Sequence, residues 1–326
     1  MSFAEPDVCP RLADDIAYRP MVSIVVATYN MGQYVAIAVD SILRQSISDI
    51  DVHVVDDGSS DDTRKILGQF SHDPRFHYHF QNNAGQASAK NCGLRYCTGM
   101  FVAFCDGDDI WPSNRLEVQL PLFQRDREIG VVYGHVEHID AAGNAIPAVD
   151  NKYLASRRHS GFVVRQLFAD NFISFGSVLV RRECLEKFGG FDESLRMGID
   201  WDLWLRVATV YKIQYCPETT LLYREWGGQM SNNWVGRYTY AFQIMEKFLR
   251  RFPDTLRPQD VRYAYAHSYV SRARLRAMRS GQYLEGLGDC LKAIRTYPLF
   301  AAPYKTVVRL IMDLVKARRR PSPLAR

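Results

Sequence analysis

Apolar runs alternate with polar, glycine-containing turns along the first part of the chain. Four of these runs are rich in β-branched or aromatic residues, as is typical of buried strands: residues 21–29, 50–55, 76–80 and 100–104. Between them, segments such as residues 34–43 place apolar side chains at helical spacing. Strands that alternate with helices predict an α/β fold with a doubly wound, mostly parallel sheet.

The pattern is less regular after this first part. Further strands are expected at residues 131–140, 174–181, 213–216 and 220–223, helices at residues 115–124, 183–188 and 202–209, and a mobile loop at residues 150–160. Beyond Trp234 only helical spacing remains. We therefore expect an N-terminal arm (residues 1–20), an α/β domain (residues 21–235) and an all-helical C-terminal region (residues 236–326).

Polar residues follow three of the predicted strands directly: residues 28–30, 56–57 and 106–109. In a doubly wound sheet, ligands bind outside the carboxyl ends of the strands. Acidic clusters at one edge repel each other unless a cation lies among them, and a hard divalent ion held by one or two carboxylates and substrate phosphates is the usual solution. Asp106 and Asp108, separated by Gly107, are the best candidates, although an acidic surface turn has the same pattern. Residues 56–62 can equally be a solvated turn with a helix cap.

The composition is that of an ordinary globular protein. The formal net charge of +5 is too small for a dedicated nucleic-acid binder, and residues 301–326 carry seven basic side chains and one acid. The seven cysteines lack zinc-ligand spacing and suit a reducing compartment. The first twenty residues have no apolar signal-peptide core, and no stretch reaches the ~20 apolar residues of a membrane span. We expect a cytoplasmic protein, at most attached to the cytoplasmic membrane face.

Six motifs occur in a fixed order: ATYN, VVDDGSSDDT, NAGQASAKN, FCDGDDIW, GIDWDLWLR and YREWGGQMS. Over residues 20–235 this series closely resembles the family 2 glycosyltransferases, which have the GT-A fold. The resemblance implies a metal-dependent, inverting transfer of a sugar from a nucleotide-sugar, UDP-sugar preferred, to an acceptor hydroxyl. It further implies Mn²⁺ or Mg²⁺ as cofactor, a glycan or lipid-linked acceptor, and a role in bacterial surface glycan or glycolipid synthesis.

The resemblance also implies roles for individual residues. Asp200 matches the general base, and Asp108 matches the metal ligand. Around the base of the donor it implies Thr28 and Tyr29, and Asp57 as acceptor from the base with Asp56 beside it. Gly85, Lys90 and Asn91 would flank the same pocket. Asp106 would face the ribose, Arg224 would hold the diphosphate, and Gly227–Gly228 would belong to a lid. Trp201 is a candidate for stacking on an acceptor sugar.

The chain departs from the family pattern at three positions. Lys90 stands where Arg is usual, Ile199 where a Glu often precedes the base, and Trp226 where a His is common. Alternatives remain for several roles. Asp202 can be the base while Asp200 caps the helix, Trp201 and Trp204 can be core aromatics, and Arg224 can pair with a surface acid.

The C-terminal region has two notable segments. Residues 281–298 faintly resemble half of a tetratricopeptide repeat, with Gly286 in place of the usual Ala. Residues 304–320 form an apolar stripe followed by Lys316 and Arg318–Arg320. This helix can pack on the catalytic domain and end in a solvated tail, or contact anionic lipid.

Two other functions fit the sequence less well. A sugar-1-phosphate nucleotidyltransferase needs a glycine-rich, basic loop after the first strand, and ATYNMGQY is not one. A non-catalytic nucleotide-sugar-binding or scaffold protein is compatible with Ile199 and Trp226. A dehydrogenase is disfavoured because no G-x-G-x-x-G follows the first strand.

Overall fold

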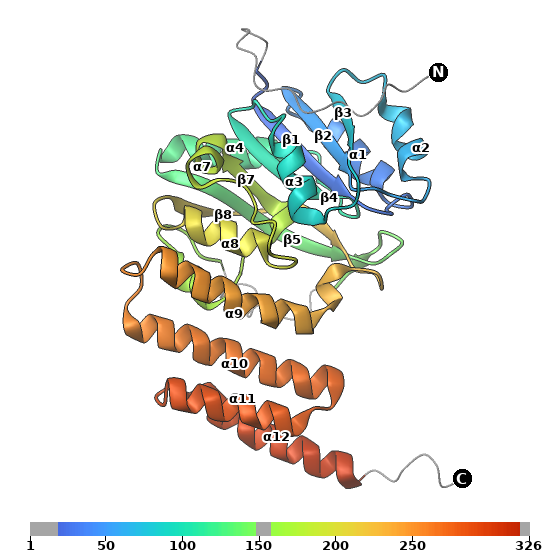
Figure 1. Cartoon of the computed structure of the whole chain (residues 1–326). Coiled ribbons are helices and arrows are strands. Elements are labelled where there is room, and N and C mark those ends of the chain that lie inside the picture. The colour runs from blue at the N-terminus through green and yellow to red at the C-terminus, as the bar shows by residue number, and fades with distance from the viewer. Residues whose placement is uncertain (1–18, 148–157, 320–326) are drawn as a thin grey trace, which may run out of the picture. The chain divides into compact units, whose positions relative to one another are not determined.

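The computed structural model describes residues 19–147 and 158–319 (Figure 1). These residues divide into two compact units, each described by itself. The first contains the described residues up to Phe162 together with Ile173–Gln229, and the second contains Val163–Phe172 together with the chain from Met230 onward. The expected loop at residues 150–160 and the N-terminal arm lie largely outside the described residues.

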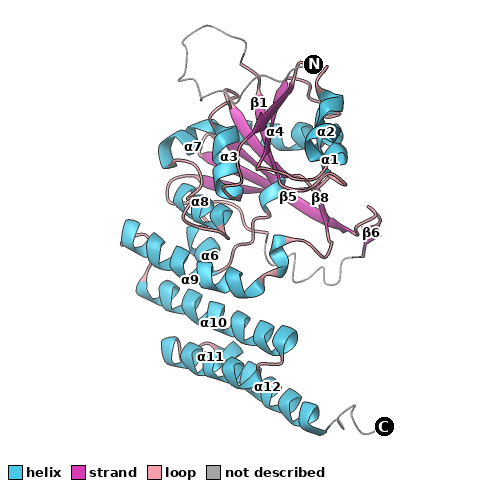
Figure 2. Cartoon of the chain, turned by 45° about the vertical axis from the view of Figure 1, so that its right-hand side comes forward, coloured by secondary structure: helices cyan, strands magenta, loops and turns pink. Residues whose placement is uncertain are grey.

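The first unit is built on an eight-stranded sheet in the order β3-β2-β1-β4-β7-β5-β6, with β8 paired to β5 (Figure 2). Its first four strands are β1 (Val22–Thr28), β2 (Ile50–Asp56), β3 (Phe76–Phe80) and β4 (Phe101–Asp106). They pair in parallel throughout. Nearly every side chain of β1, β2 and β4 is buried, which explains their continuous apolar runs. The predicted mostly parallel α/β fold is confirmed.

The rest of the sheet contains antiparallel pairs. β7 (Val178–Arg181) lies antiparallel between β4 and β5 (Ile129–Ile139), and β6 (Ala145–Ile146) pairs with the end of β5. Where the sequence predicted two strands, the structure has one long strand, β8 (Lys212–Arg224), so that prediction is wrong. The apolar pattern breaks at Pro217 and Glu218, where the pairing with β5 shifts its register but continues. Pro has no N–H to donate to the ladder, and a β-bulge accommodates it.

Helices cover the sheet and bury their apolar sides against it (Figure 1). Their bounds are α1 (Val35–Leu43), α2 (Thr63–Leu67), α3 (Gln86–Leu94), α4 (Arg115–Arg125), α7 (Arg182–Phe188) and α8 (Ile199–Val207), with 3₁₀ turns at Gly68–Phe70 and Phe175–Ser177. The main core cluster combines β1, β2 and β4 with α1 and α4, including Ile24, Val39, Val54 and Leu116. This core holds the carboxyl ends of the strands in fixed positions.

The second unit is helical, as the sequence predicted. It contains α6 (Val164–Ala169), α9 (Trp234–Arg251), α10 (Pro258–Ser280), α11 (Tyr283–Thr296) and α12 (Ala301–Arg319), with a 3₁₀ turn at Met230–Asn232. Gly281, with φ at 63°, ends α10 and lets the chain turn directly into α11. A Cβ at Gly286 would lie 3.0 Å from the carbonyl of Ala273, so the glycine allows α10 and α11 to pack closely.

Sequence reasoning missed the contribution of α6 to this unit. Phe168 packs against Phe248 of α9, and Arg165 pairs with Asp260 of α10 at 2.7 Å. None of the helices in the described part of the chain is long and apolar enough to cross a membrane. The basic end of α12, which the sequence associated with lipid, falls mostly outside the described side chains.

Candidate active site

The ends of β1, β2 and β4 lie side by side at one edge of the sheet. Thr28 is the register partner of Asp56, and Ala27 is the partner of Asp106. Three of the segments that the sequence singled out therefore meet at one edge. This placement follows from the parallel pairing of the three strands, since their carboxyl ends point the same way.

The carboxylates after β2 hold their own loop together. Asp56 is fully buried and accepts hydrogen bonds from the Ser59 N–H at 2.8 Å and from the Tyr78 hydroxyl at 2.9 Å. Asp57, also buried, accepts from three groups that belong to the segment before α3: Gln81 Nε2 at 2.8 Å, the Ala84 N–H at 2.9 Å and the Gly85 N–H at 2.9 Å. Asp57 thus fixes the backbone around Gly85, and a hydrogen bond to a nucleotide base stays a prediction.

The carboxylates after β4 are arranged differently. Asp106 is paired through Oδ1 with Lys90 Nζ at 3.0 Å, and its side chain is 39% exposed. The ammonium group of Lys90 is buried, 3.9 Å from the centre of the Phe175 ring, and 3.3 Å from Gln86 Oε1. Lys90 therefore supplies one positive charge to the loop, and Phe175, which sequence reasoning missed, limits where that charge can lie.

Asp108 lies in a mostly buried, negatively charged setting. Burial raises the pKa of its carboxyl group, and the nearby charge of Asp106 raises it further. Burial and the charges of Asp108 and Asp106 also raise the pKa of Asp109 well above its usual range. The Trp226 indole opposes the shift at Asp108 by donating from Nε1 to Oδ2 at 2.8 Å. Such a cluster gains from a bound cation, because the cation offsets the repulsion between the carboxylates.

Two further features at this edge fit a ligand that contains a metal ion. The hydroxyl of Thr28 is buried and has no hydrogen-bond partner within residues 19–147 and 158–319. Gly107 lies so close that a Cβ there would be 2.9 Å from this hydroxyl. In the described part of the chain no three His, Cys, Asp or Glu side chains form a metal-binding group. Asp106 and Asp108 nevertheless fit Mn²⁺ or Mg²⁺, because Mg²⁺ usually takes one or two carboxylates and completes its shell with phosphate oxygens and water.

Arg224, at the end of β8, holds the backbone of the Asp108 loop in place. It is buried, and its guanidinium donates to the carbonyls of Asp108 at 2.8 Å, Asp140 at 3.2 Å and Ala141 at 3.1 Å. The backbone N–H of Arg224 donates to Asp109 Oδ1 at 3.1 Å. The arginine thus pairs with backbone carbonyls and not with a surface acid. These contacts give it a positioning role, and a contact with the diphosphate stays a prediction.

The segment after Arg224 places Trp226 beside the same loop. The indole packs edge-to-face on Tyr34 with 5.5 Å between ring centres, and the backbone N–H of Trp226 donates to Gln229 Oε1 at 3.1 Å. A Cβ at Gly228 would lie 2.2 Å from this indole, so the glycine of the expected lid is required by the close packing of Trp226. At this departure from the family pattern, an indole N–H therefore contacts the carboxylate proposed as metal ligand.

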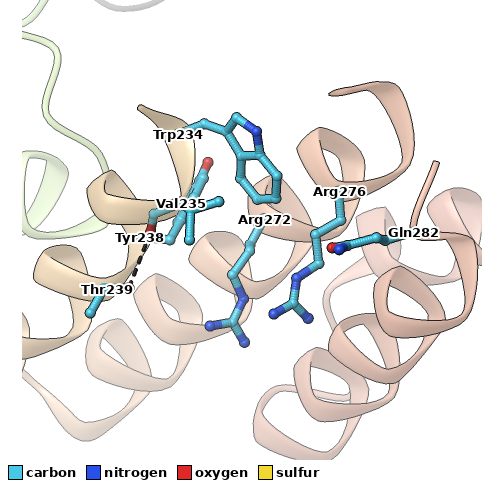
Figure 3. Close-up of a pocket in the computed structure, with 7 residues that line it drawn as sticks. All are labelled: Trp234, Val235, Tyr238, Thr239, Arg272, Arg276 and Gln282. Atoms are coloured by element: carbon cyan, nitrogen blue, oxygen red, sulfur yellow. Dashed lines mark hydrogen bonds between the residues drawn. The ribbon is translucent and has the colours of Figure 1, made fainter. Parts of the chain in front are cut away.

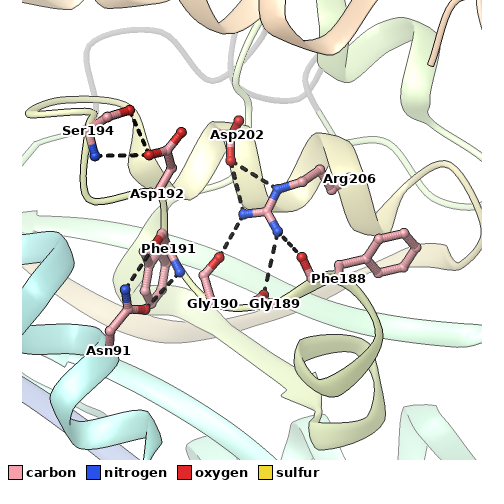
Figure 4. A network of polar contacts seen from close by, with 9 residues as sticks. All are labelled: Asn91, Phe188, Gly189, Gly190, Phe191, Asp192, Ser194, Asp202 and Arg206. Carbon is pink, nitrogen blue, oxygen red and sulfur yellow. Dashed lines mark hydrogen bonds and ion pairs between the residues drawn. The ribbon is translucent and has the colours of Figure 1, made fainter. Parts of the chain in front are cut away.

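The helix α8 separates its two acids into different environments. Gly198, with φ at 71°, precedes the helix, and Asp200 is half-buried in the first turn. Asp202 is buried and paired at 2.9 Å with Arg206, whose guanidinium also donates to the carbonyls of Phe188 and Gly190 (Figure 4). The Asp202–Arg206 pair therefore holds the preceding loop, and Asp200 is the less buried of the two acids. Its role as the general base stays a prediction.

Side-chain bonds connect the loop before α8 to α3, the helix that carries Lys90. Asn91 donates to the Phe191 carbonyl at 2.9 Å and accepts from the Phe191 N–H at 2.8 Å (Figure 4). Gln86 donates from Nε2 to the Arg196 carbonyl at 3.0 Å. Because Gln86 also contacts Lys90, the chain leading to Asp200 is tied to the group that pairs with Asp106. Asn91 was expected beside the nucleotide, and its observed partners are in this loop.

The aromatic candidates differ in exposure. Tyr29 is 47% exposed next to Thr28, where a nucleotide base can reach it. Trp201 is only 7% exposed and Trp204 is fully buried, which favours packing over sugar stacking. For Trp201, contact with an acceptor stays a prediction.

A mostly parallel α/β sheet with a carboxylate-rich loop after its fourth strand, followed by a helical region, is the arrangement that the GT-A resemblance predicts. The sequence model of Glycosyl transferase family 2 matches residues 23–189, just over half of the chain. The chain belongs to this family and is a glycosyltransferase, which confirms the resemblance seen in the motifs.

Relatives in sequence and structure agree with this assignment. The chain is 28% identical over 235 residues to an uncharacterised glycosyltransferase of Rickettsia prowazekii, covering 72% of this chain and 73% of the relative. It is 32% identical over 192 residues to the chondroitin synthase of Escherichia coli, covering 59% of this chain but only 27% of that protein.

Among solved structures, a fragment of S. aureus TarS in complex with UDP-GlcNAc matches with a TM-score of 0.65, 18% identity and 91% coverage of both chains. The mannosyltransferase PcManGT of Pyrobaculum calidifontis, in complex with GDP-Man and Mn²⁺, matches with a TM-score of 0.54 and 19% identity, covering 97% of this chain and 92% of that one. These two structures share the fold.

Proposed function

We propose that the chain transfers a sugar from a UDP-sugar to an acceptor hydroxyl by a metal-dependent, inverting displacement. In this proposal residues 21–235 are the catalytic domain and residues 236–326 a helical extension. The observation that carries it is the edge formed by β1, β2 and β4, where Asp106 and Asp108 lie near the unpartnered hydroxyl of Thr28. Two structures of the same fold, one in complex with UDP-GlcNAc and one in complex with GDP-Man and Mn²⁺, support a nucleotide-sugar donor and a metal ion here.

The donor would lie across this edge. Thr28 and the exposed ring of Tyr29 would contact the base, with Asp57 and Gly85 shaping the opposite wall, and Asp106 would face the ribose. Asp108 would hold Mn²⁺ or Mg²⁺, which as a Lewis acid would offset the charge of the departing diphosphate. Lys90 would place a buried positive charge beside Asp106. We propose that Arg224 contributes chiefly by fixing the backbone of Asp108 and Asp109.

Asp200 would act as the general base. Its carboxylate would take the proton of the acceptor hydroxyl while that oxygen forms a bond to the anomeric carbon and the bond to the diphosphate oxygen breaks. A single displacement from the face opposite the leaving group inverts the anomeric configuration. The pairing of Asp202 with Arg206 supports this choice, because it leaves Asp200 as the less buried acid of the helix.

A thermal-shift panel tests donor binding directly. UDP, GDP and dTDP, each alone and as sugar conjugates, are added with and without Mn²⁺. A ligand at ~100 times its dissociation constant should stabilise the protein by ~2.7 kcal/mol. We expect the largest shift for a UDP-sugar with Mn²⁺. Equal shifts for all nucleotides, or none that depend on Mn²⁺, would contradict the proposal.

A non-catalytic nucleotide-sugar-binding protein is the second candidate, favoured by the hydrogen bond of Trp226 to Asp108. It predicts binding of a UDP-sugar without turnover. Incubation of the protein with UDP-GlcNAc and Mn²⁺, followed by measurement of released UDP over hours, separates the two. Slow release that is lost in Asp200→Asn identifies an enzyme, and no release in the presence of any offered acceptor favours the binding protein.

We further propose that the acceptor is a glycan or a lipid-linked glycan of the bacterial surface, and that α12 contacts anionic membrane from the cytoplasmic side. Val308, Ile311 and Met312 on this helix are between 47% and 58% exposed, which supports an apolar contact. Ile311→Asn should weaken co-sedimentation with vesicles that contain anionic lipid. If the wild-type protein does not bind such vesicles at low salt, the membrane contact is wrong.

A further inference from the structure

The helical unit contains a pocket that the transferase reaction does not use. The pocket has a volume of about 250 Å³ and lies where the start of α9 faces α10 and the start of α11 (Figure 3). Its lining residues are Trp234, Val235, Tyr238, Thr239, Arg272, Arg276 and Gln282. All of them belong to the second unit, so the pocket is complete without any residue of the strand-end site.

The two arginines give this pocket an excess of positive charge. Asp289 is 1% exposed and accepts from Arg272 at 2.8 and 2.6 Å and from Arg276 at 2.9 Å. One carboxylate therefore balances two guanidinium groups. A guanidinium has five N–H donors in a fixed plane, so three remain on Arg272 and four on Arg276. Among the described residues, these two side chains make no other hydrogen bonds.

The position of Arg272 is also fixed by aromatic rings. The Arg272 guanidinium lies 4.9 Å from the centre of the Phe242 ring and 5.4 Å from that of Tyr269. Figure 3 shows both guanidinium groups next to each other, on the α10 side of the pocket. Two adjacent guanidinium groups with N–H donors to spare can bind the oxygens of a carboxylate or a phosphate in a bidentate manner.

The opposite wall is aromatic. Trp234 and Tyr238 combine an apolar ring face with a polar tip, which suits a ligand that is apolar on one face and polar at its rim. Thr239 donates its hydroxyl proton to the Val235 carbonyl at 3.1 Å and can still accept a hydrogen bond from a ligand, and Gln282 adds an amide. The volume is below the 300–1,000 Å³ typical of pockets for larger ligands, so one ring of a chain fits better than a whole nucleotide.

We infer that this pocket binds a single sugar residue that carries an anionic group, with its ring against Trp234 and its carboxylate or phosphate on Arg276 and Arg272. The inference goes beyond the proposed function, because it assigns a second carbohydrate site to the helical unit. An acidic glycan held there would be retained by the protein independently of the donor.

Binding of small probes to the full chain tests the inference. Glucuronate, glucose 6-phosphate, glucose and inorganic phosphate are titrated by calorimetry, and saturation-transfer NMR reports contact with the sugar ring protons. We expect one or both anionic sugars to bind at least about tenfold more tightly than glucose, as a charge-assisted hydrogen bond implies. The stronger of the two identifies carboxylate or phosphate as the anion. Inorganic phosphate that binds as tightly as glucose 6-phosphate would overturn the sugar contact, and no binding of either anionic sugar would overturn the site.

Matched variants assign the binding to the pocket. Arg276→Ala should weaken binding of the anionic sugars about tenfold or more, because it removes one of the two guanidinium groups that face the ligand. The fold should be kept, because the paired bonds of Arg272 with Asp289 remain. Arg279→Ala, an exposed arginine on the same helix, should leave the affinity unchanged. Trp234→Ala should weaken the sugars but not inorganic phosphate.

Thermal melting and binding of UDP with Mn²⁺ serve as controls for folding and for the separate donor site, so failure of one proposal does not imply failure of the other. If Arg276→Ala melts at a lower temperature, it is replaced by Arg276→Gln, which removes the charge but keeps the aliphatic part of the side chain and supplies an amide NH₂ that can donate to Asp289. Wild-type affinity in a folded Arg276 variant would show that the pocket is not the site.

Discussion

The loops after β2 and β4 look alike in sequence but differ in structure. Both follow a buried strand and both begin with a pair of nearby aspartates. The carboxylates of Asp56 and Asp57 accept five hydrogen bonds between them from their own surroundings. Asp108 and Asp109, by contrast, have raised pKa values because they are buried beside other negative charges. The acidic turn after β2 therefore serves the structure of its own loop. The turn after β4, where Asp108 and Asp109 each accept a hydrogen bond, is the one that we propose binds a ligand.

The two acids of α8 differ in burial, and substitution of the less buried one, Asp200, should have the strongest effect. Asp200→Asn should lower kcat about 10²–10⁴-fold, as loss of a general base does. It should change the free energy of unfolding by at most about 1 kcal/mol, the usual contribution of an acid in the first turn of a helix. Steady-state kinetics with a UDP-sugar and thermal melting measure the two quantities.

Asp202 is the matched residue for that experiment. Asp202→Ala should destabilise the fold by about 3–5 kcal/mol, because it leaves Arg206 buried without its partner. Remaining folded protein should keep the wild-type dependence of kcat on pH. If Asp202→Ala abolishes turnover at wild-type stability while Asp200→Asn is active, the assignment of the two acids is reversed.

Asp57→Asn should have an intermediate effect, chiefly on stability. The substitution replaces one acceptor oxygen with an amide group that cannot accept from the N–H of Gly85. We expect a loss of about 1–3 kcal/mol in the free energy of unfolding, the typical cost of one unsatisfied buried group. Urea unfolding measures it, with Asp62→Asn on the exposed side of the same turn as control. Unchanged stability would mean that the carboxylate after β2 is not needed by its loop.

Trp226→Phe should have a smaller effect, and on the loop after β4. The phenyl ring keeps the packing on Tyr34 but removes the N–H that donates to Asp108. Freed of this bond, the carboxylate should bind Mn²⁺ about two- to tenfold more tightly, as expected for one hydrogen bond. Calorimetric titration of Mn²⁺ in the presence of UDP measures the affinity. A weaker affinity would indicate that the indole orients Asp108 for the metal.

The last effect, which is absent near neutral pH, concerns the β2–β3 edge. Burial lowers the pKa of His79 to about 4, and the neighbouring imidazoles of His53 and His77 contribute. An unfolded histidine has a pKa near ~6.5, so between these values the unfolded chain binds a proton that the folded chain does not. Stability should therefore fall as the pH falls from about 6.5 towards 4. His79→Gln should flatten this slope, and an unchanged slope between pH 6.5 and 5 would rule out the contribution of His79.

The sequence predicted the parts of this structure that depend on local pattern. The parallel strands, their order along the chain and the acidic residues at their ends follow from β-branched runs and polar turns. The single strand β8 was divided in two because Pro217 and Glu218 interrupt its apolar pattern, whereas the pairing partner β5 carries the strand past them. A partner strand more than eighty residues earlier in the chain leaves no trace in the local spacing.

The contacts of each site residue were harder to predict than the strands, because their partners are also distant in sequence. Arg224 bonds to the carbonyls of Asp140 and Ala141, and Lys90 lies over Phe175. Backbone carbonyls are available at every position, so sequence cannot indicate which of them a buried guanidinium will meet. The pairing of Asp202 with Arg206 is the exception, because their spacing of four residues on one helix is a recognisable signal.

Electron paramagnetic resonance distinguishes free from bound Mn²⁺, so a titration in the presence of UDP shows whether Asp108 holds a metal ion beside the nucleotide. The wild-type protein should bind about one Mn²⁺ per chain only when UDP is present. Asp108→Asn should lose this binding and melt at the wild-type temperature or above, since its buried charge is removed. Wild-type Mn²⁺ binding by Asp108→Asn, together with its loss in Asp57→Asn, would contradict the account.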